Sequence, residues 1–233
     1  MPALLDPQSL GQLSLFHGLS LAELGHLNDL LGKTRFQAGA GIMTATQPGE
    51  VVYIVLDGTL KVSVVQADGR ELSLAILGPG ETVGELALAD RGGRSADVVA
   101  LEPTTMLWLD RTQFGLLRRE MPALTENLLV LLARRLRLAN AQLQAIATLD
   151  VHGRVARQLL ALADAYGEAV PGTTGAVRIP LRLTQGDLAN LVGATRVRVN
   201  EVLVGFKRRH SLAVDAWHRV TILDRQALAE YCE

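Results

Sequence analysis

The chain has 233 residues, 48% of them hydrophobic and 20% charged, so we expect two compact folded domains. Residues 1–150 carry 12 Lys and Arg against 16 Asp and Glu, whereas residues 151–233 carry 11 against 8, which suits a ligand domain followed by a domain that binds a polyanion. The single cysteine, Cys232, excludes a disulfide within the chain and a cysteine-rich metal centre, and the lack of a signal-peptide pattern or a long apolar run predicts a cytoplasmic protein that does not enter the membrane.

The first half of the chain changes from a helical pattern to a β-strand pattern. Residues 12–32 are expected to form short helices, because Ser20 followed by Glu23 is a capping-box pattern. From Thr34 to about Asp110, short β-rich runs alternate with turn residues, which predicts a jelly roll or barrel. Asp68-Gly69 predicts a two-residue hairpin turn. The expected strands are Val51–Leu56, Leu60–Val65, Leu72–Leu77, Val98–Leu101 and Met106–Leu109.

Residues 123–149 predict one long helix, because the stretch contains no Gly or Pro and is rich in Leu, Ala and Arg. Its apolar residues alternate in steps of three and four, which is the spacing of a coiled-coil seam. We therefore favour a homodimer formed through this helix over a helix packed only on its own domain. The seam residues are Leu129, Leu132, Leu136, Ala139, Leu143 and Ile146.

The last third of the chain predicts a domain of short helices and strands. The pattern becomes amphipathic and helical again after residue 151, and Gly, Thr and Pro then mark a loop. We expect helices at 152–166, Gln185–Val192 and Arg196–Arg209, a loop at 168–176, a strand at Ile179–Leu183 and a β-hairpin at Leu212–Leu223.

The segment that starts at Gly84 carries the most informative ligand-binding pattern. A Gly-Glu pair precedes a short apolar turn, and an Arg-Ser-Ala run then leads into a strand. Arg94 can give two charge-assisted hydrogen bonds to a phosphate, and Ser95 can add another donor. The main-chain N–H groups of residues 85–88 open a short helix that favours an anion, and Gly84 lets the backbone approach closely. Glu85 can accept a hydrogen bond from a ribose hydroxyl.

Residues 184–203 fit a helix-turn-helix. Thr184 is expected to cap the first helix, with Asp187 at the capping-box position. Gly193 ends that helix and makes the sharp turn, and Thr195 caps the second helix. In this motif the N-terminal residues of the second helix face base edges in the major groove.

The second helix of this motif offers a set of side chains for DNA. Arg196 can bind guanine, Asn200 can pair with adenine, and Val197 can contact a thymine methyl group. Glu201 can accept from cytosine, whereas the remaining basic residues suit phosphates. The alternative is a solvated charged helix face. The expected DNA-binding residues are Thr195, Arg196, Val197, Arg198, Asn200, Glu201 and Lys207, with Arg208 and Arg209 on phosphate.

Together these patterns resemble the CRP/FNR family of regulators over about residues 13–225. Gly-Glu-Leu-Ala-Leu, with Arg-Ser-Ala nine residues after the Glu, is similar to the phosphate-binding cassette of cyclic-nucleotide-binding domains. The resemblance implies an α+β protein with an N-terminal cyclic-nucleotide-binding β jelly roll, a long dimerisation helix and a C-terminal winged helix-turn-helix. These parts would occupy residues 1–122, 123–150 and 151–233.

The resemblance implies a cyclic nucleotide as effector, with cyclic AMP as the first choice, and no covalent cofactor. In cyclic AMP-responsive members a Thr-Ser pair on the dimer helix contacts the adenine, and here Ala139 and Asn140 occupy those positions. Since a methyl group cannot hydrogen-bond, ribose and phosphate capture is supported better than adenine recognition. The alternative is a regulator that acts without ligand, in which Glu85 and Arg94 pair internally. The expected ligand-binding residues are Gly84, Glu85, Leu86, Arg94, Ser95, Ala139 and Asn140.

The resemblance also implies double-stranded operator DNA and RNA polymerase as partners. The family's first, second and sixth recognition positions fall on Arg196, Val197 and Glu201, and the last two depart from the cyclic AMP-responsive pattern, so no operator sequence is carried over. The hairpin would be a wing, in which His218 or Arg219 contacts phosphate. Trp217 could equally be core packing and is not expected to contact a base. The scattered histidines and the lack of a Walker loop or a Ser-His-Asp spacing argue against an enzyme.

Overall fold

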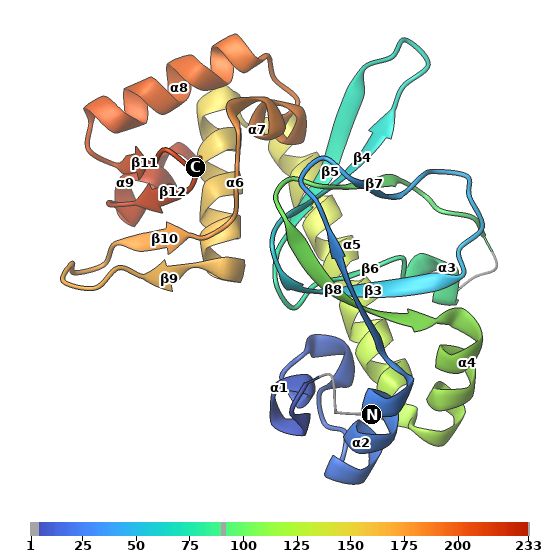
Figure 1. Ribbon diagram of the computed structural model, residues 1–233. Helices are drawn as coiled ribbons and strands as arrows, with labels where there is room; N and C mark the ends of the chain where they lie inside the picture. Colours follow the sequence, from blue (N-terminus) through green and yellow to red (C-terminus); the bar gives the residue numbers. More distant parts are fainter. Residues whose placement is uncertain (1–4, 90–91, 233) are drawn as a thin grey trace. The chain divides into compact units, whose positions relative to one another are not determined.

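A computed structural model describes residues 5–89 and 92–232, and it divides the chain into two compact units (Figure 1). The first unit contains the residues up to Val64 together with Ile76–Arg137, and the second contains Val65–Ala75 and the residues from Leu138 onward. Helices and strands are both abundant, which confirms the expected α+β class. No helix in the described ranges is long and apolar enough to cross a membrane.

Short helices open the first unit, as the capping pattern predicts. They are α1 (Pro7–Gly11), the 3-10 turn η1 (Ser14–Phe16) and α2 (Leu21–Leu30). Ser20 accepts a hydrogen bond from the Glu23 main chain while the Glu23 carboxylate accepts one from the Ser20 N–H, so the predicted capping box is present.

Eight strands follow and form two four-stranded sheets, in the orders β1-β8-β3-β6 and β2-β7-β4-β5. The five predicted strands are confirmed as β3, β4, β5, β7 and β8, whereas β1, β2 and β6 were not anticipated. β8 pairs antiparallel with both β1 and β3, and it alternates buried with half-buried residues, so one of its faces enters the core. The strands are β1 (Gly32–Phe36), β2 (Gly41–Met43), β3 (Val51–Asp57), β4 (Leu60–Val65), β5 (Glu71–Leu77), β6 (Thr82–Val83), β7 (Asp97–Ala100) and β8 (Thr104–Asp110).

The connection between β4 and β5 is longer than the predicted two-residue turn. Gln66 N–H donates to the Arg70 carbonyl at 2.8 Å, which leaves three residues in the loop rather than two. Gly69 has φ +80°, so it supplies the left-handed residue that a three-residue hairpin loop requires at that point. The hairpin was therefore predicted correctly, but its loop length was wrong.

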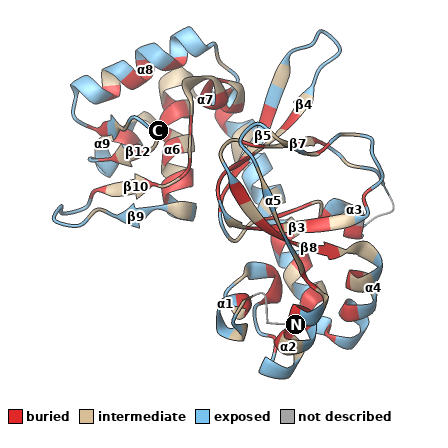
Figure 2. Ribbon diagram, viewed as in Figure 1, coloured by how far each residue is buried: buried red, intermediate tan, exposed pale blue. Residues whose placement is uncertain are grey.

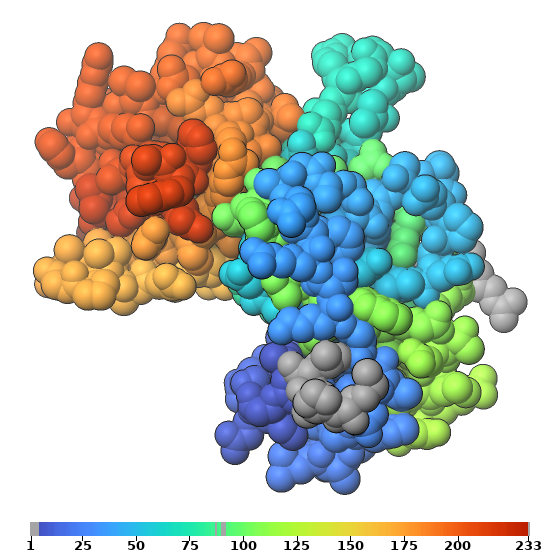
Figure 3. Space-filling view, viewed as in Figure 1, coloured from blue at the N-terminus to red at the C-terminus, as the bar shows by residue number. Residues whose placement is uncertain are grey.

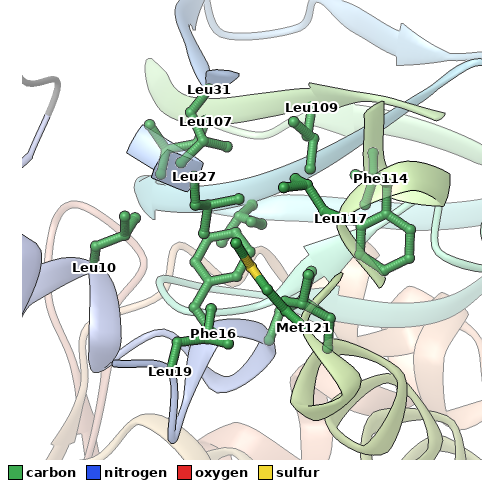
Figure 4. Close-up of a cluster of buried hydrophobic side chains, with 14 of the residues drawn as sticks. Leu10, Phe16, Leu19, Leu27, Leu31, Leu107, Leu109, Phe114, Leu117 and Met121 are labelled. Carbon is green, nitrogen blue, oxygen red and sulfur yellow. The ribbon is translucent and has the colours of Figure 1, made fainter. Parts of the chain in front are cut away.

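Three helices complete the first unit: α3 (Leu86–Ala89), α4 (Arg111–Glu120) and α5 (Pro122–Thr148), whose last residues belong to the second unit. Side chains from α1, α2, the strands, α4 and the start of α5 share one apolar core (Figure 4). Each large aliphatic or aromatic side chain buried there contributes roughly 1.5–3 kcal/mol. Its members include Leu10, Phe16, Leu27, Leu107, Leu109, Phe114, Leu117, Met121, Leu124 and Leu128.

The long helix α5 has two apolar faces with different surroundings. Leu124, Leu128 and Leu131 are buried at successive steps of four and three residues. The predicted seam lies on another face, where most of its residues are more than half exposed. Packing on its own domain therefore accounts for one face of α5 and partly covers Leu132, but it leaves the other five seam residues exposed. The exposed leucines and isoleucine are Leu129, Leu136, Leu143 and Ile146.

The second unit combines five helical segments with a four-stranded sheet in the order β11-β12-β10-β9 (Figure 1). The predicted strand at Ile179–Leu183 was placed too late, because Pro180 has no N–H to donate and ends β10. The predicted loop at 168–176 also contains β9. The elements are α6 (Val151–Tyr166), β9 (Glu168–Ala169), β10 (Val177–Ile179), α7 (Gln185–Val192), α8 (Arg196–Arg208), β11 (Leu212–Val214), β12 (Val220–Ile222), α9 (Arg225–Ala229) and η2 (Glu230–Cys232).

The turn between α7 and α8 provides a stability test. Gly193 has φ +62°, so Gly193→Ala should lower the free energy of unfolding by about 1–2 kcal/mol, because a Cβ is disfavoured in this conformation. Gly205→Ala is the matched control, because a Cβ there has open space and alanine favours a helix interior by up to about 1 kcal/mol. Urea denaturation of both variants measures the difference. Equal stabilities would contradict the role of the left-handed turn.

Candidate functional site

Gly84 and Arg94 fit together at the centre of the candidate ligand cassette. Gly84 has φ +85°, and a Cβ at this position would lie 2.3 Å from Arg94 Nη1 and 2.9 Å from the Val51 carbonyl oxygen. Both the backbone conformation and the lack of space therefore require glycine. The Arg94 guanidinium occupies the space beside Gly84, and the close approach of the Gly84 backbone to a ligand stays a prediction.

The Arg94 side chain is held by main-chain oxygens. Nη2 donates to the Val51 carbonyl at 2.6 Å, and Nη1 donates to the Gly84 carbonyl at 3.3 Å. Burial lowers the pKa of the half-buried guanidinium, while the Tyr53 phenol and the Glu85 carboxylate act in the opposite direction. Within the described residues, no carboxylate lies within ion-pair distance of Arg94. The positive charge is thus oriented by neutral groups rather than neutralised.

Glu85 is buried, with 2% of its surface exposed, and its charge partner is Arg135 of α5. The Arg135 guanidinium donates to Glu85 Oε1 and to the Thr82 carbonyl. The alternative of an internal Glu85–Arg94 ion pair is wrong, because Glu85 bonds Arg135 instead. The sequence reasoning missed Arg135, although the buried row at positions 124, 128 and 131 continues to it at the next step of four. Beside this pair, Arg134 Nη2 lies 2.7 Å from Glu81 Oε1.

The other predicted ligand residues lie in more open positions. Leu86 begins α3 and is 41% exposed, and Ser95 is exposed. Ala139 and Asn140 are exposed on the part of α5 that belongs to the second unit. Two residues within the cassette pattern, at positions 90 and 91, lie outside the described residues.

A hollow of about 340 Å³ opens beside Arg94. Its walls come from β2, β3 and the loop between them, and Tyr53 packs edge-on against Phe36 at 5.9 Å between ring centroids. Glu85 and Ser95 do not line it. The lining residues are Ile42, Met43, Gln47, Pro48, Glu50, Val51, Tyr53 and Arg94.

The helix-turn-helix of the second unit has the predicted geometry. Thr184 and Asp187 form a capping box at the start of α7, and Thr195 accepts a hydrogen bond from the Arg198 main chain at the start of α8. Arg154 of α6 donates to the Val192 carbonyl at 2.9 Å and to that of Gly193 at 3.3 Å. The turn that sets the direction of α8 is therefore fixed from within and from α6. The buried side of α8 consists of Val199, Val202, Leu203 and Phe206.

The opposite side of α8 is exposed (Figure 2), and the helix lies at the surface of the second unit in the space-filling view (Figure 3). Most side chains on this exposed side are polar. Arg198 Nη1 lies 2.8 Å from Glu201 Oε2, so the one acid of this face is ion-paired with a base on the next turn. Gln185 Nε2, from the first residue of α7, donates to Asn200 Oδ1 at 2.7 Å. The sequence reasoning missed Gln185. The predicted DNA residues Thr195, Arg196, Val197, Arg198, Asn200, Glu201 and Lys207 are all exposed.

The predicted wing is formed by β11 and β12. Asp215 Oδ1 accepts hydrogen bonds from the main-chain N–H groups of Trp217 and Arg219, which closes the tip. His218 has φ +62°, and Arg219 Nε donates to the Pro180 carbonyl. Trp217 is 66% exposed, so the core alternative for this residue is wrong.

These features define a protein in which a β-rich domain precedes a winged helix-turn-helix, the architecture of a DNA-binding regulator. The sequence profile of the cyclic nucleotide-binding domain matches residues 33–120, and that of the Crp-like helix-turn-helix domain matches residues 153–231.

The chain is 34% identical to a CRP-like cAMP-activated global transcriptional regulator of Mycobacterium tuberculosis over 220 residues, which cover 94% of this chain and 96% of the relative. It is 35% identical to the cyclic AMP receptor protein of Thermus thermophilus over 191 residues, covering 81% and 83% of the two chains. The crystal structure of the Thermus thermophilus catabolite activator protein has a TM-score of 0.53 at 31% identity, with 94% and 98% covered. FixK2 from Bradyrhizobium japonicum shares the fold, with a TM-score of 0.77 at 20% identity and 87% and 98% covered.

The chain therefore belongs to the CRP/FNR family of transcription regulators. This is a family of DNA-binding regulators and not of enzymes, as expected from the sequence.

The buried pair between α5 and the cassette provides a second test. Arg135→Met should lower the free energy of unfolding by about 2–3 kcal/mol, because it leaves the Glu85 carboxylate buried without a charge partner. Adding Glu85→Gln should recover part of the loss, because the amide carries no charge. Urea denaturation of the two variants measures this recovery. If the double variant is less stable than Arg135→Met, the carboxylate does not depend on Arg135.

Proposed function

We propose that this regulator binds operator DNA as a homodimer under the control of a cyclic nucleotide, with cyclic AMP as the first candidate. The observation that carries the proposal is Arg94, whose guanidinium is half buried and bonded only to neutral carbonyls among the described residues. A buried charge is costly unless it gains an opposite charge. A cyclic phosphate supplies that charge and fits the fork of the guanidinium.

The remaining cassette residues are suited to the rest of such a ligand. Glu85 uses Oε1 for Arg135, and its other lone pairs can accept ribose hydroxyl groups. Ser95 is assigned a donor role to the phosphate, and Gly84 and Leu86 are assigned main-chain contacts. These residue types fit a sugar phosphate.

Readout of the base is the weaker part of the ligand proposal. We assign it to Asn140, whose amide can donate and accept, and to Ala139, which offers only a methyl contact. The relatives described as cAMP-activated support cyclic AMP. The alternative is a regulator of the same family that acts without ligand, which Ala139 favours.

Linkage between effector and DNA is assigned to α5. Ribose hydroxyls that bond Glu85 act on the same carboxylate that holds Arg135, so ligand binding changes how this helix is restrained. Since α5 continues along the chain toward α6, its restraint can bias the two recognition helices of a dimer toward the spacing of successive major grooves, about 34–36 Å.

The exposed seam of α5 supports the homodimer. A second copy would cover side chains such as Leu136 and Leu143, which are 64% and 65% exposed. We also assign RNA polymerase as a partner and the cytoplasm as the location, and we propose 1–122, 123–150 and 151–233 as sensor, dimerisation helix and DNA-binding domain.

On the DNA side, base readout is assigned to α8. Arg196 is assigned to guanine, Asn200 to adenine, and Val197 to a thymine methyl group. Glu201 is assigned to cytosine. Thr195, Arg198 and Lys207 are assigned to the backbone, where contacts fix register without reading sequence.

Calorimetric titration with cyclic AMP and cyclic GMP tests the effector. Arg94→Leu should abolish binding, because it removes the phosphate's charge partner. Arg119→Leu, which replaces an exposed arginine of α4, should bind like the unaltered protein. No heat of binding with either nucleotide would favour the ligand-independent alternative, and tight binding by Arg94→Leu would refute the assigned pocket.

Fluorescence anisotropy with duplexes selected from a random library tests base readout. Arg196→Ala should weaken specific binding by about 1–3 kcal/mol and relax the preference at one base pair. Lys207→Ala is the matched control, because a phosphate contact weakens all sequences alike and lowers the salt dependence. An unchanged sequence preference in Arg196→Ala would show that this residue reads no base.

A further inference from the structure

We propose that Gln185 is a specificity-determining residue, which acts by fixing the amide of Asn200 so that it reads adenine. This inference rests on the proposed readout of bases by α8. Gln185 is the first residue of α7, and Asn200 lies on the second turn of α8. The two side chains form a polar bridge between the helices of the motif.

The direction of the hydrogen bond determines which Asn200 groups remain for DNA. Gln185 Nε2 donates to Oδ1 at 2.7 Å, and neither amide makes another hydrogen bond among the described residues. Asn200 therefore retains both Nδ2 hydrogens and one lone pair on Oδ1. Adenine presents N7 as an acceptor and N6 as a donor in the major groove, so this donor and acceptor match it.

The same hydrogen bond disfavours guanine. Guanine presents two acceptors, N7 and O6, so the Asn200 Oδ1 atom would face an acceptor. A donor could take that place only if the amide turned so that Nδ2 replaced Oδ1. A turn of Asn200 alone would place Nδ2 against Nε2 of Gln185, which brings two donors together. To exchange the donor and the acceptor that Asn200 shows to the base, both amides must therefore turn together, whereas adenine is read by the bridge as it stands.

The environment of the pair suits this role. Asn200 is exposed and Gln185 is half exposed, so the bridge lies at the surface and does not fill the core. A free asparagine would lose rotamer freedom when it meets a base, and the bridge removes that loss in advance. Beside Gln185, the capping box of Thr184 and Asp187 fixes the main chain at the start of α7, from which the Gln185 side chain extends.

The test is a competition between two duplexes in the presence of cyclic AMP, using the full-length protein. Selection from a random library first identifies the base pair whose preference Asn200→Ala removes. Gln185→Met, which keeps the length but removes the donor, should lower the adenine preference at that pair by about twofold to tenfold. The double variant, Gln185→Met with Asn200→Ala, should show no further loss of adenine preference beyond that of Asn200→Ala alone. Gln226→Met, an exposed glutamine of α9, should leave the preference unchanged.

The possible outcomes separate this inference from the proposed function. If Asn200→Ala changes a base preference and Gln185→Met does not, or if the two effects add, the bridge has no role in reading. If Gln185→Met weakens all duplexes equally, it removes a backbone contact, and the inference is overturned. If no base preference depends on Asn200, its proposed role in readout fails as well. Thermal unfolding midpoints that match the unaltered protein ensure that a lost preference is not a folding defect.

Discussion

The ion pair between Arg135 and Glu85 is the interaction on which the sensor unit depends most. The carboxylate is buried and the guanidinium comes from α5, so the pair ties the long helix to the cassette, and its loss would leave Glu85 buried without a charge partner. Arg135 also donates to the Thr82 carbonyl, so it orders the strand that leads into the cassette. A ligand that bonds Glu85 therefore acts on the anchoring of the helix.

Arg94 and Gly84 show how the barrel prepares a positive charge without neutralising it. The glycine leaves the space into which the guanidinium packs, and main-chain carbonyls orient it. Among the described residues, no carboxylate forms an ion pair with Arg94. Glu85, the acid next to Gly84 in the sequence, pairs with Arg135 instead. Glu85 and Arg94, which the sequence pattern could pair with each other, are thus kept apart. This separation leaves the Arg94 charge for an anionic ligand.

The DNA-binding unit uses the same principle of fixing polar groups before a partner arrives. Gly193 and Arg154 determine the turn, and the threonine side chains that cap α7 and α8 determine where these helices start. Side-chain pairs restrain the polar face of α8. Glu201 is the one acid of this face, and Arg198 forms an exposed ion pair with it, which places a positive charge beside the carboxylate. The recognition helix therefore presents a partly ordered surface, which reduces the entropy lost on binding.

The sequence by itself determined the order of the main elements and the positions of both motifs, although β1, β2, β6 and β9 were not anticipated. Hydrophobic spacing predicted α5 and most strands, and local capping and turn residues such as Ser20, Thr184 and Gly193 predicted the helix boundaries, because these signals act over a few residues. Local errors arose where one residue overrode a pattern, as with Pro180 at the end of β10.

Only the tertiary structure decided which charged and polar side chains meet. Arg135 and Glu85 are 50 residues apart, and Gln185 and Asn200 are 15 apart, so no local signal pairs them. Their contacts follow from which row of a helix faces the barrel and how α7 crosses α8, and those are decided by packing of the whole unit. Exposure of the α5 seam was decided in the same way, because burial depends on neighbours that spacing along one helix does not specify.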